Sequence, residues 1–535
     1  MNRSPHPPIR TQSDATGRVR RAQPVIGRRS LMTLAAGAGV AAIGTAGRGM
    51  FLPWFDISRA AAAVELVEPE VRASRDGLLD TVLTARVMSL PLAGQTATVS
   101  VYESSFPGPN LRVRPGDALR VNLVNTLDAL PSGLPQTSPF ICSPVTGPGH
   151  MPNSTEHAMT CDTNLHVHGL HVSPEGNSDN IFLTVKAGES FQYEYQIPEN
   201  HPAGLYWYHP HRHGAVTNQV FGGMAGSIII EGDIDALPGI AGVPERLLVL
   251  QATQLYPDGS VTNIVDVPPT GPSMQKMYLR LVNGQLNPTM TIRPGETQRW
   301  RILNATVNVT YLLQLGGHQL HQIAKDGNTL NETWTRDKIT LGPGERVEVL
   351  VQGGQAGTYT LRTLPFSTGL TTQKDATLAT LVVDGDPMTA EPLPTTLLPV
   401  EDLSTADIAA QRWFTFQNGT FPPLPADTSF WVNNKAFDGT RDDAVVRLNT
   451  TEEWVIRNAS GTWHPFHIHI NDFQVVAVNG QRVPVRYHED TTGIPPFGEF
   501  TMRTRFTDFP GRWVFHCHIL LHEDHGMMGT VKALP

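Results

Sequence analysis

The chain has 535 residues, which is enough for about three domains of ~150 residues each. Glycine (48) and proline (43) are abundant and only 17% of residues are charged, a composition that favours strands and turns and argues against a helical protein. The net charge of -9 argues against a nucleic-acid partner, and none is expected.

Residues 1–63 have the pattern of an export signal. An arginine- and proline-rich stretch ends in Arg28-Arg29, and the apolar run that follows, 31–46, is too short and too rich in glycine and alanine for a membrane span. The paired arginines resemble a twin-arginine signal, and a peptidase could cut at 60–63. We expect export to the periplasm or beyond, with no stable membrane span in the mature chain. An ordinary secretory signal or an uncleaved anchor is the alternative.

From residue 64 onward, one unit of short alternating strands is written three times. Its first half reads LRVRPGDALRVNLVN at 111–125, MTIRPGETQRWRILN at 290–304 and, in a shorter form, VRLNTTEEWVIRN at 446–458. A Pro-Gly turn between two alternating strands explains the first two copies. Short strands with regular turns are typical of β-sandwiches, so each copy predicts one sandwich.

The end of each unit repeats as well, and the middle copy differs from the others. The segments AGLYWYH, AGTYTLR and PGRWVFH, at 203–209, 356–362 and 510–516, align without gaps. His209 and His516 of the outer copies correspond to Arg362 of the middle copy, and the positions equivalent to His467 and His469 are leucines there. The middle unit therefore has the framework without the candidate metal ligands.

We predict an all-β chain with domains at 64–238, 239–392 and 393–535. The first domain contains a loop-like insertion, 126–165, whose role the sequence does not reveal. Its Cys142 and Cys161 could form a disulfide in an exported protein or remain free thiols.

Histidine pairs separated by one residue occur twice in the first unit and twice in the third. On a strand, residues two apart point to the same face, so each pair presents two imidazoles together. Imidazole suits copper, and eight imidazoles suffice for three copper ions at a domain interface, with positions left open for dioxygen. The pairs are His166/His168, His209/His211, His467/His469 and His516/His518.

Cys517 lies within the last of these pairs, with His522 five residues after it and Met527 ten residues after it. A thiolate, an imidazole and a weak thioether make a blue-copper site once a second imidazole arrives from elsewhere. Because neighbouring side chains on a strand point to opposite faces, His516 and His518 should face a different site from Cys517. The segment would then join two metal sites through a few covalent bonds.

The strings LHVHG, WYHPHRHG, HPFHIH and HCHILLHEDHGM resemble the four copper motifs of the multicopper oxidases. The likeness is closest to three-domain bacterial laccases and cuprous oxidases, and it covers essentially the whole chain after the export segment. It implies three consecutive cupredoxin-like Greek-key β-sandwich domains and four copper ions per chain. The implied ligands are His464, Cys517, His522 and axial Met527 for type 1 copper, His166 and His467 for type 2, and His168, His209, His211, His469, His516 and His518 for the type 3 pair.

The resemblance also implies an oxidase that takes electrons from a small reducing substrate near His522 and passes them through Cys517 to dioxygen. Protons need a carboxylate near the cluster. Asp179 stands where the family often keeps an acid, and Glu523 resembles the acid that bacterial laccases place near the dioxygen site. We expect both to be catalytic. The alternatives are a turn-forming role for Asp179 and a solvated surface charge for Glu523.

The leading hypothesis is a monomeric laccase-like oxidase of phenols or aromatic amines. An oxidase of metal ions, namely Cu(I), Mn(II) or Fe(II), is the alternative, although the 14 methionines form no cluster of the kind that copper-tolerance members carry. A copper-free exported scaffold would have lost ligands, and here all are present. A copper nitrite reductase would have two domains and fewer histidines.

Overall fold

The computed structural model describes residues 64–134, 138–145, 159–256, 259–261, 277–418, 430–485 and 487–535. The predicted export segment lies outside these ranges. Within them strands dominate, and the α-helices are short: α1 (Val216–Gly222) and α2 (Leu520–Asp524). None of the helices in the described ranges has the length and apolar character needed to cross a membrane.

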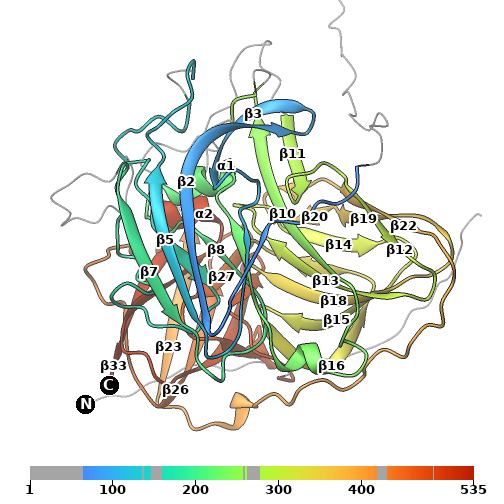
Figure 1. The fold of residues 1–535 in the computed structure, drawn as a ribbon. Helices are drawn as coiled ribbons and strands as arrows, with labels where there is room; N and C mark the ends of the chain where they lie inside the picture. Colours follow the sequence, from blue (N-terminus) through green and yellow to red (C-terminus); the bar gives the residue numbers. More distant parts are fainter. Residues whose placement is uncertain are drawn as a thin grey trace, which may run out of the picture. The chain divides into compact units, whose positions relative to one another are not determined.

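The first sandwich consists of a five-stranded and a four-stranded sheet (Figure 1). Along β5 (Ala118–Thr126) every second residue is buried, because successive side chains of a strand point to opposite faces. The five-stranded sheet has the order β1 (Val71–Ala73), β4 (Asn110–Val113), β9 (Gly226–Ile230), β8 (Gly204–His209), β6 (His166–His168), and the other has the order β3 (Gln95–Tyr102), β2 (Leu78–Leu92), β5 (Ala118–Thr126), β7 (Ser190–Gln196).

The second sandwich has sheets of six and five strands, with the buried Trp300 in its core. The larger has the order β11 (Met277–Val282), β10 (Glu245–Leu255), β13 (Thr297–Asn304), β18 (Arg346–Gln352), β15 (Leu320–Lys325), β16 (Asn328–Arg336). The smaller has the order β12 (Thr289–Ile292), β22 (Ala376–Val383), β19 (Gly357–Leu364), β14 (Tyr311–Leu315), β17 (Ile339–Leu341), and a separate hairpin joins β20 (Phe366–Ser367) and β21 (Thr372–Gln373).

The third sandwich repeats the six-plus-five arrangement, with Trp454 in its core. The larger sheet has the order β24 (Phe430–Val432), β23 (Ala410–Asn418), β26 (Thr450–Asn458), β31 (Glu499–Phe506), β28 (Phe473–Val478), β29 (Gln481–Arg482). The smaller has the order β25 (Ala444–Arg447), β33 (Met528–Leu534), β32 (Gly511–Cys517), β27 (His464–Ile468), β30 (Thr491–Ile494).

The three sandwiches share the strand pairing around the repeated segment, as the repeat predicts. The strands that end the repeated segment, β5, β13 and β26, each pair in parallel with an earlier strand (β2, β10, β23) and antiparallel with a later one (β7, β18, β31). The prediction of three β-sandwiches is therefore confirmed. The boundaries predicted near 238 and 392 fall in the connections between the sandwiches and stay predictions.

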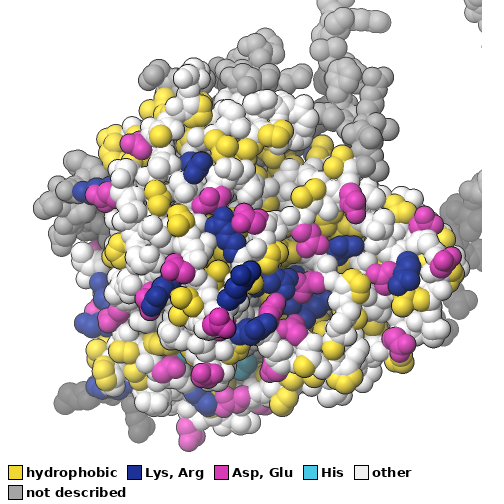
Figure 2. Space-filling view, viewed as in Figure 1, with side chains coloured by type: hydrophobic (Ala, Val, Ile, Leu, Met, Phe, Trp, Pro, Cys, Tyr) yellow, Lys and Arg dark blue, Asp and Glu magenta, His cyan; other side chains and the backbone are white. Residues whose placement is uncertain are grey.

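Apolar and ionic contacts join the first sandwich to the second. Trp207 and Leu205 of β8 pack in one buried cluster with Leu247 and Leu303 of the second sandwich. On the face shown in Figure 2, basic side chains gathered near the centre lie next to acidic ones. One interdomain ion pair joins Arg112 of β4 to Glu245 of β10. The first and second domains are thus held together by packing as well as by charge.

Candidate metal centre

Four strand segments bring the histidine pairs to one place. In the first sandwich β6 pairs with β8 so that His166 lies opposite His209, and in the third β27 pairs with β32 so that His467 lies opposite His516. The two sandwiches meet at these histidines, where the ring of His467 stacks on that of His168 with centroids 3.7 Å apart. All eight histidines of the four pairs are at most 1% exposed. The predicted interface cluster is therefore present.

Within the cluster, the Nε2 atoms of three histidines lie close together. The Nε2 atom of His516 lies 3.2 Å from Nε2 of His211 and 3.3 Å from Nε2 of His469. A second group of three consists of His168, His209 and His518, in which Nδ1 of His168 lies 3.2 Å from Nε2 of His518. Each group combines histidines from the first and third sandwiches.

His166 and His467 form the remaining part of the cluster. The Nδ1 atom of His166 lies 2.9 Å from Asp179 Oδ1, and Nδ1 of His467 lies 3.0 Å from the backbone oxygen of Asp490. The opposite nitrogens, Nε2 of both rings, are buried and make no hydrogen bond to any described residue. An imidazole whose first nitrogen donates a hydrogen bond offers the other as a lone pair to a metal.

The charge state of these imidazoles fits metal binding. Burial lowers the pKa of His166 and His168 well below the ordinary value for histidine, and nearby imidazoles lower it further. The neutral imidazole is the form that binds metals. When Nδ1 of each ring carries the proton, the Nε2 lone pairs that converge at 3.2–3.3 Å repel each other, and a cation among them would remove that repulsion. The residues present therefore fit the copper ions that the motifs imply.

A separate group of ligand atoms lies in the third sandwich. The Cys517 sulfur is 3.2 Å from Nδ1 of His464 and 3.5 Å from Nδ1 of His522, and these two nitrogens are 3.2 Å apart. Burial raises the pKa of the Cys517 thiol, so a bound cation is needed to hold the thiolate in this place. Met527 belongs to the same buried cluster as Cys517, whereas Met528 packs in a different one, which favours Met527 over Met528 as the thioether ligand.

Both predicted carboxylates lie against the histidine cluster. Asp179 is buried, contacts His166, accepts a hydrogen bond of 3.1 Å from the Val167 backbone and has a pKa that burial raises to about 8. Glu523 lies 3.3 Å from Nδ1 of His211 and 3.1 Å from Nδ1 of His516. Burial raises the pKa of Glu523 to about 8. Because Glu523 is fully buried, its alternative interpretation as a solvated surface charge is wrong.

The neighbouring Asp524 was not expected from the sequence to have a role. Its carboxylate, from the third sandwich, accepts hydrogen bonds from the backbone of Gly214 (2.6 Å) and Thr217 (2.8 Å) and from the Thr217 hydroxyl (2.6 Å). Thr217 is in the first turn of α1, so Asp524 caps a helix of another domain. The acidic pair Glu523-Asp524 beside a ligand is a signal that the sequence contains. The sequence does not predict that one carboxylate contacts the histidine cluster and the other contacts α1.

Sequence reasoning also missed Asp490 and Thr491, which contact His168 and His467. They lie between the third and fourth copper motifs, 21 and 22 residues after His469, and no spacing rule links them to the histidines.

Histidines outside the four pairs have other contacts. His171 in the first domain is hydrogen-bonded by Nδ1 to the Ile470 backbone oxygen and by Nε2 to Asp508, both at 2.7 Å. His318 and His321 contact groups of their own middle domain, in keeping with structural roles.

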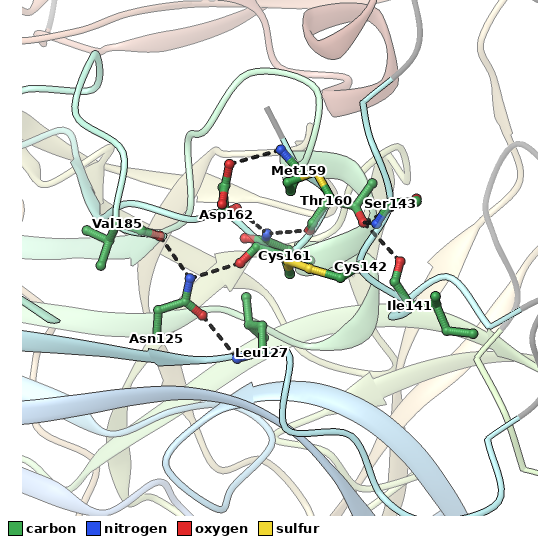
Figure 3. The surroundings of a disulfide bond; sticks show 11 residues. Asn125, Leu127, Ile141, Cys142, Ser143, Met159, Thr160, Cys161, Asp162 and Val185 are labelled. Carbon is green, nitrogen blue, oxygen red and sulfur yellow. Dashed lines mark hydrogen bonds between the residues drawn. A yellow bond between two sulfur atoms is a disulfide. The ribbon is translucent and has the colours of Figure 1, made fainter. Parts of the chain in front are cut away.

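A disulfide closes the insertion, which answers the question the sequence left open. Cys142 and Cys161 are joined with their Cα atoms 5.1 Å apart (Figure 3). The side-chain amide of Asn125, at the end of the repeated segment, donates to the backbone oxygens of Cys161 and Val185, each at 2.8 Å. Residues 135–137 and 146–158 of the insertion lie outside the described residues.

Comparison with known families gives a consistent result. Three models described as multicopper oxidase match residues 153–234, 249–386 and 405–535. These ranges fall in the first, second and third sandwiches respectively.

Similar proteins and similar solved structures come from the same family as the matching models. The chain is 26% identical to the multicopper oxidase mco of Staphylococcus aureus, covering 81% of this chain and 83% of the relative. It is also 26% identical to a laccase of Bacillus stratosphericus, covering 81% and 90%. A laccase from Pediococcus acidilactici superimposes with a TM-score of 0.71 at 25% identity, covering 89% and 95%, and a Campylobacter jejuni metallo-oxidase with 0.70 at 24%, covering 88% and 94%. The chain therefore belongs to the multicopper oxidase family and is an oxidase built from three cupredoxin-like β-sandwich domains.

Proposed function

We propose that this oxidase is laccase-like: it oxidises phenols or aromatic amines by one electron at a time and reduces dioxygen to water with four electrons. The proposal includes four copper ions per chain. When bound, copper supplies the one-electron redox steps and a place for dioxygen. The motifs and the grouping of ligand atoms support this assignment.

The grouping suggests which side chains share an ion. His464, Cys517 and His522, with Met527, would hold type 1 copper, and His166 and His467 would hold type 2. One type 3 ion would be held by His168, His209 and His518, and the other by His211, His469 and His516.

Cys517 provides the covalent connection between the two regions. Its sulfur faces His464 and His522, while His516 and His518 on either side of it lie in the histidine cluster. From the Cys517 sulfur, the side chain and the adjoining peptide units would therefore give an electron a short bonded route to His516 and His518.

Asp179 and Glu523 are placed to supply protons from two sides of the cluster. Asp179 contacts His166 and lies 3.9 Å from Nδ1 of His469, whereas Glu523 contacts His211 and His516. Both side chains are buried, so each can hold a proton close to where dioxygen would be reduced. We assign both as proton donors.

The surroundings of His522 favour an organic electron donor, and this observation carries the choice of substrate class. The ring of Phe430 stacks on His522 with centroids 4.1 Å apart. The two carboxylates that follow His522 are directed elsewhere, Glu523 into the histidine cluster and Asp524 onto α1. Neither is free to bind a metal ion beside His522, and the Phe430 ring, which is only 3% exposed, packs against His522 without offering a metal ligand, so the described surroundings favour an organic donor over a metal ion.

Dioxygen uptake by the copper-loaded protein tests the substrate class. The panel comprises phenols, an aromatic diamine, Cu(I), Fe(II) and Mn(II), and Cys517→Ser, which lacks the type 1 thiolate, is the control. Uptake with phenols or the diamine, lost in the control, is expected. Uptake confined to a metal ion would contradict the laccase-like assignment and favour a metal-ion oxidase.

We also propose that the protein is exported through its twin-arginine-type signal and acts as a monomer. The disulfide supports export, because disulfides persist in oxidising compartments. The N-terminal sequence of the exported protein tests cleavage: a start beyond residue 46 is expected, and a start at Met1 would contradict it.

A further inference from the structure

The middle domain contributes no imidazole to the cluster, yet Arg346 of its strand β18 reaches the cluster's edge. This side chain is fully buried. Its guanidinium donates two hydrogen bonds to the Asp490 carboxylate of the third domain, from Nη1 to Oδ1 (2.8 Å) and from Nη2 to Oδ2 (2.6 Å). Its Nε donates to the backbone oxygen of Leu205 in the first domain, at 3.1 Å. One side chain thus contacts all three domains.

Asp490 and its neighbour Thr491 contact two of the cluster's imidazoles. Nε2 of His168 lies 3.1 Å from Asp490 Oδ1, and Nδ1 of His467 lies 3.0 Å from the Asp490 backbone oxygen. The Thr491 hydroxyl lies 3.1 Å from the same nitrogen of His467 and donates to Asp490 Oδ1 at 2.7 Å. A carboxylate that accepts from one imidazole nitrogen decides which nitrogen remains for the metal. The position of Asp490 therefore affects both rings.

Two further residues of the middle domain form hydrogen bonds with the backbone of Thr491, the residue after Asp490. Asp326 accepts hydrogen bonds from the backbones of Arg346 (2.8 Å) and Thr491 (3.2 Å). Lys325 donates to the Thr491 backbone oxygen at 2.9 Å. The first domain leaves room for the pair, because a Cβ added at Gly169 would lie 2.3 Å from Arg346 Nη2 and 2.6 Å from Asp490 Oδ2. All three domains thus shape the position of one carboxylate.

We propose that Arg346 is a positioning residue for the copper cluster: through its paired hydrogen bonds it fixes Asp490, which in turn orients His168 and His467. The copperless domain would then help to form a metal site that contains none of its own ligands. The inference rests on the copper assignment and is independent of the identity of the electron donor.

Arg301 provides a matched control. It is an equally buried arginine of the same domain, and it pairs with Glu348 (2.8 Å) and Glu245 (2.6 Å). None of its hydrogen bonds or ion pairs involves a cluster histidine or its contacts. Replacing either arginine by lysine keeps the charge but removes paired donation from a planar group. A purely structural role for Arg346 would make the two variants behave alike.

The experiment compares wild type, Arg346→Lys and Arg301→Lys after copper loading and graded dialysis against a chelator. Copper per chain, the paramagnetic resonance signal of type 2 copper, the blue absorption of type 1 copper and the thermal midpoint are recorded. Arg346→Lys should lose the type 2 signal at about 10–100-fold lower chelator concentration than wild type, with the blue absorption intact. Arg301→Lys should lower only the thermal midpoint.

Wild-type retention of type 2 copper in Arg346→Lys, or an equal loss in Arg301→Lys, would overturn the inference. If Arg346→Lys does not fold, Asp490→Asn serves in its place, because it keeps the shape of the side chain and weakens the pair from the other side. The same selective loss is expected there, and a wild-type signal would overturn the inference. A wild-type protein that binds no copper would instead contradict the proposed function.

Discussion

At the scale of single residues, the second nitrogen of each imidazole determines what the ring can do. His166 uses Nδ1 on Asp179 and His467 uses Nδ1 on the Asp490 backbone, so both offer Nε2 to the cluster. His168 is turned the other way, with Nε2 on Asp490 and Nδ1 facing inward. The motifs predict which histidines are present, whereas these partners decide which atom of each is available.

Glu523→Gln tests the proton-donor role. The amide keeps the shape of the side chain but cannot transfer a proton, so turnover should fall about 100-fold or more. The blue absorption should persist, because Glu523 lies at the histidine cluster and not beside the Cys517 sulfur. Steady-state dioxygen uptake and the visible spectrum are the measurements. Glu499→Gln, which alters a carboxylate paired with the half-exposed Arg457, is the control, and equal turnover in the two variants would reject the role.

His171 should make stability depend on pH. Burial lowers its pKa, but hydrogen bonds to Asp508 and the Ile470 oxygen outweigh burial, and the pKa of His171 is raised overall. The hydrogen bond from His171 lowers the pKa of Asp508 to about 2. A raised histidine pKa contributes stability that is complete below about pH 6.5, the unfolded value, and is lost as the pH rises through the folded pKa.

Urea unfolding across that pH window measures the contribution. Because Asp508 is half-exposed, the loss should be only about 0.5–1 kcal/mol. The fall in unfolding free energy with rising pH should become smaller in His171→Gln and, to the same extent, in Asp508→Asn. A decline of unchanged slope in both variants would show that this pair is not its source.

At the scale of elements, the strands place the ligands and the short helices connect the domains. Strand β32 ends at Cys517 and is followed by α2, so His516 to Asp524 lie within one compact stretch. Glu523 and Asp524 leave α2 in different directions, one toward the histidines and the other toward α1. A single turn of helix thereby serves both the metal cluster and the interface with the first domain.

Asp524→Ala should destabilise that interface. Three hydrogen bonds to a buried carboxylate would be lost and two backbone N–H groups left without their acceptor, at a cost of about 3 kcal/mol in unfolding free energy. Asp402→Ala is the comparison, because Asp402 caps an exposed 3-10 turn by accepting from the Ser404 backbone and should cost about 1 kcal/mol. Equal midpoints for the two variants in urea would contradict the interdomain cap.

At the scale of the whole molecule, the metal cluster is part of the interface between the first and third domains. Each group of three histidines takes members from both domains, so ions bound there would tie the two together. From the second domain, Arg346 and Lys325 form hydrogen bonds with Asp490 and Thr491, which contact the cluster. Removing copper should therefore affect the stability of the assembly as well as its activity.

Copper removal should lower the thermal midpoint, because a ligand that binds only the folded state stabilises it. At free copper about a thousand-fold above its dissociation constant, the stabilisation is about 4 kcal/mol per site. Calorimetry of the loaded, stripped and reloaded protein measures the effect, with recovery on reloading as the control. Identical midpoints for the loaded and stripped protein would contradict binding at the interface.

The sequence was most informative where a repeat or a spacing rule applies. Three sandwiches follow from the repeated segment, and the gathering of the histidine pairs follows from strand alternation. Arg346, Asp490 and Asp524 could not be found in this way, because each acts on another domain and nothing local records that contact. Pairing of Cys142 with Cys161 was likewise open, since it depends on how the insertion folds back.

The most direct test of the account is the ratio of donor oxidised to dioxygen consumed by the copper-loaded protein, with hydrogen peroxide assayed in parallel. A phenol or aromatic amine that gives one electron at a time should be consumed at about four molecules per dioxygen, without peroxide, and stripping copper should abolish uptake. A ratio of about two with accumulating peroxide, or uptake that is indifferent to copper, would contradict reduction of dioxygen to water at this cluster.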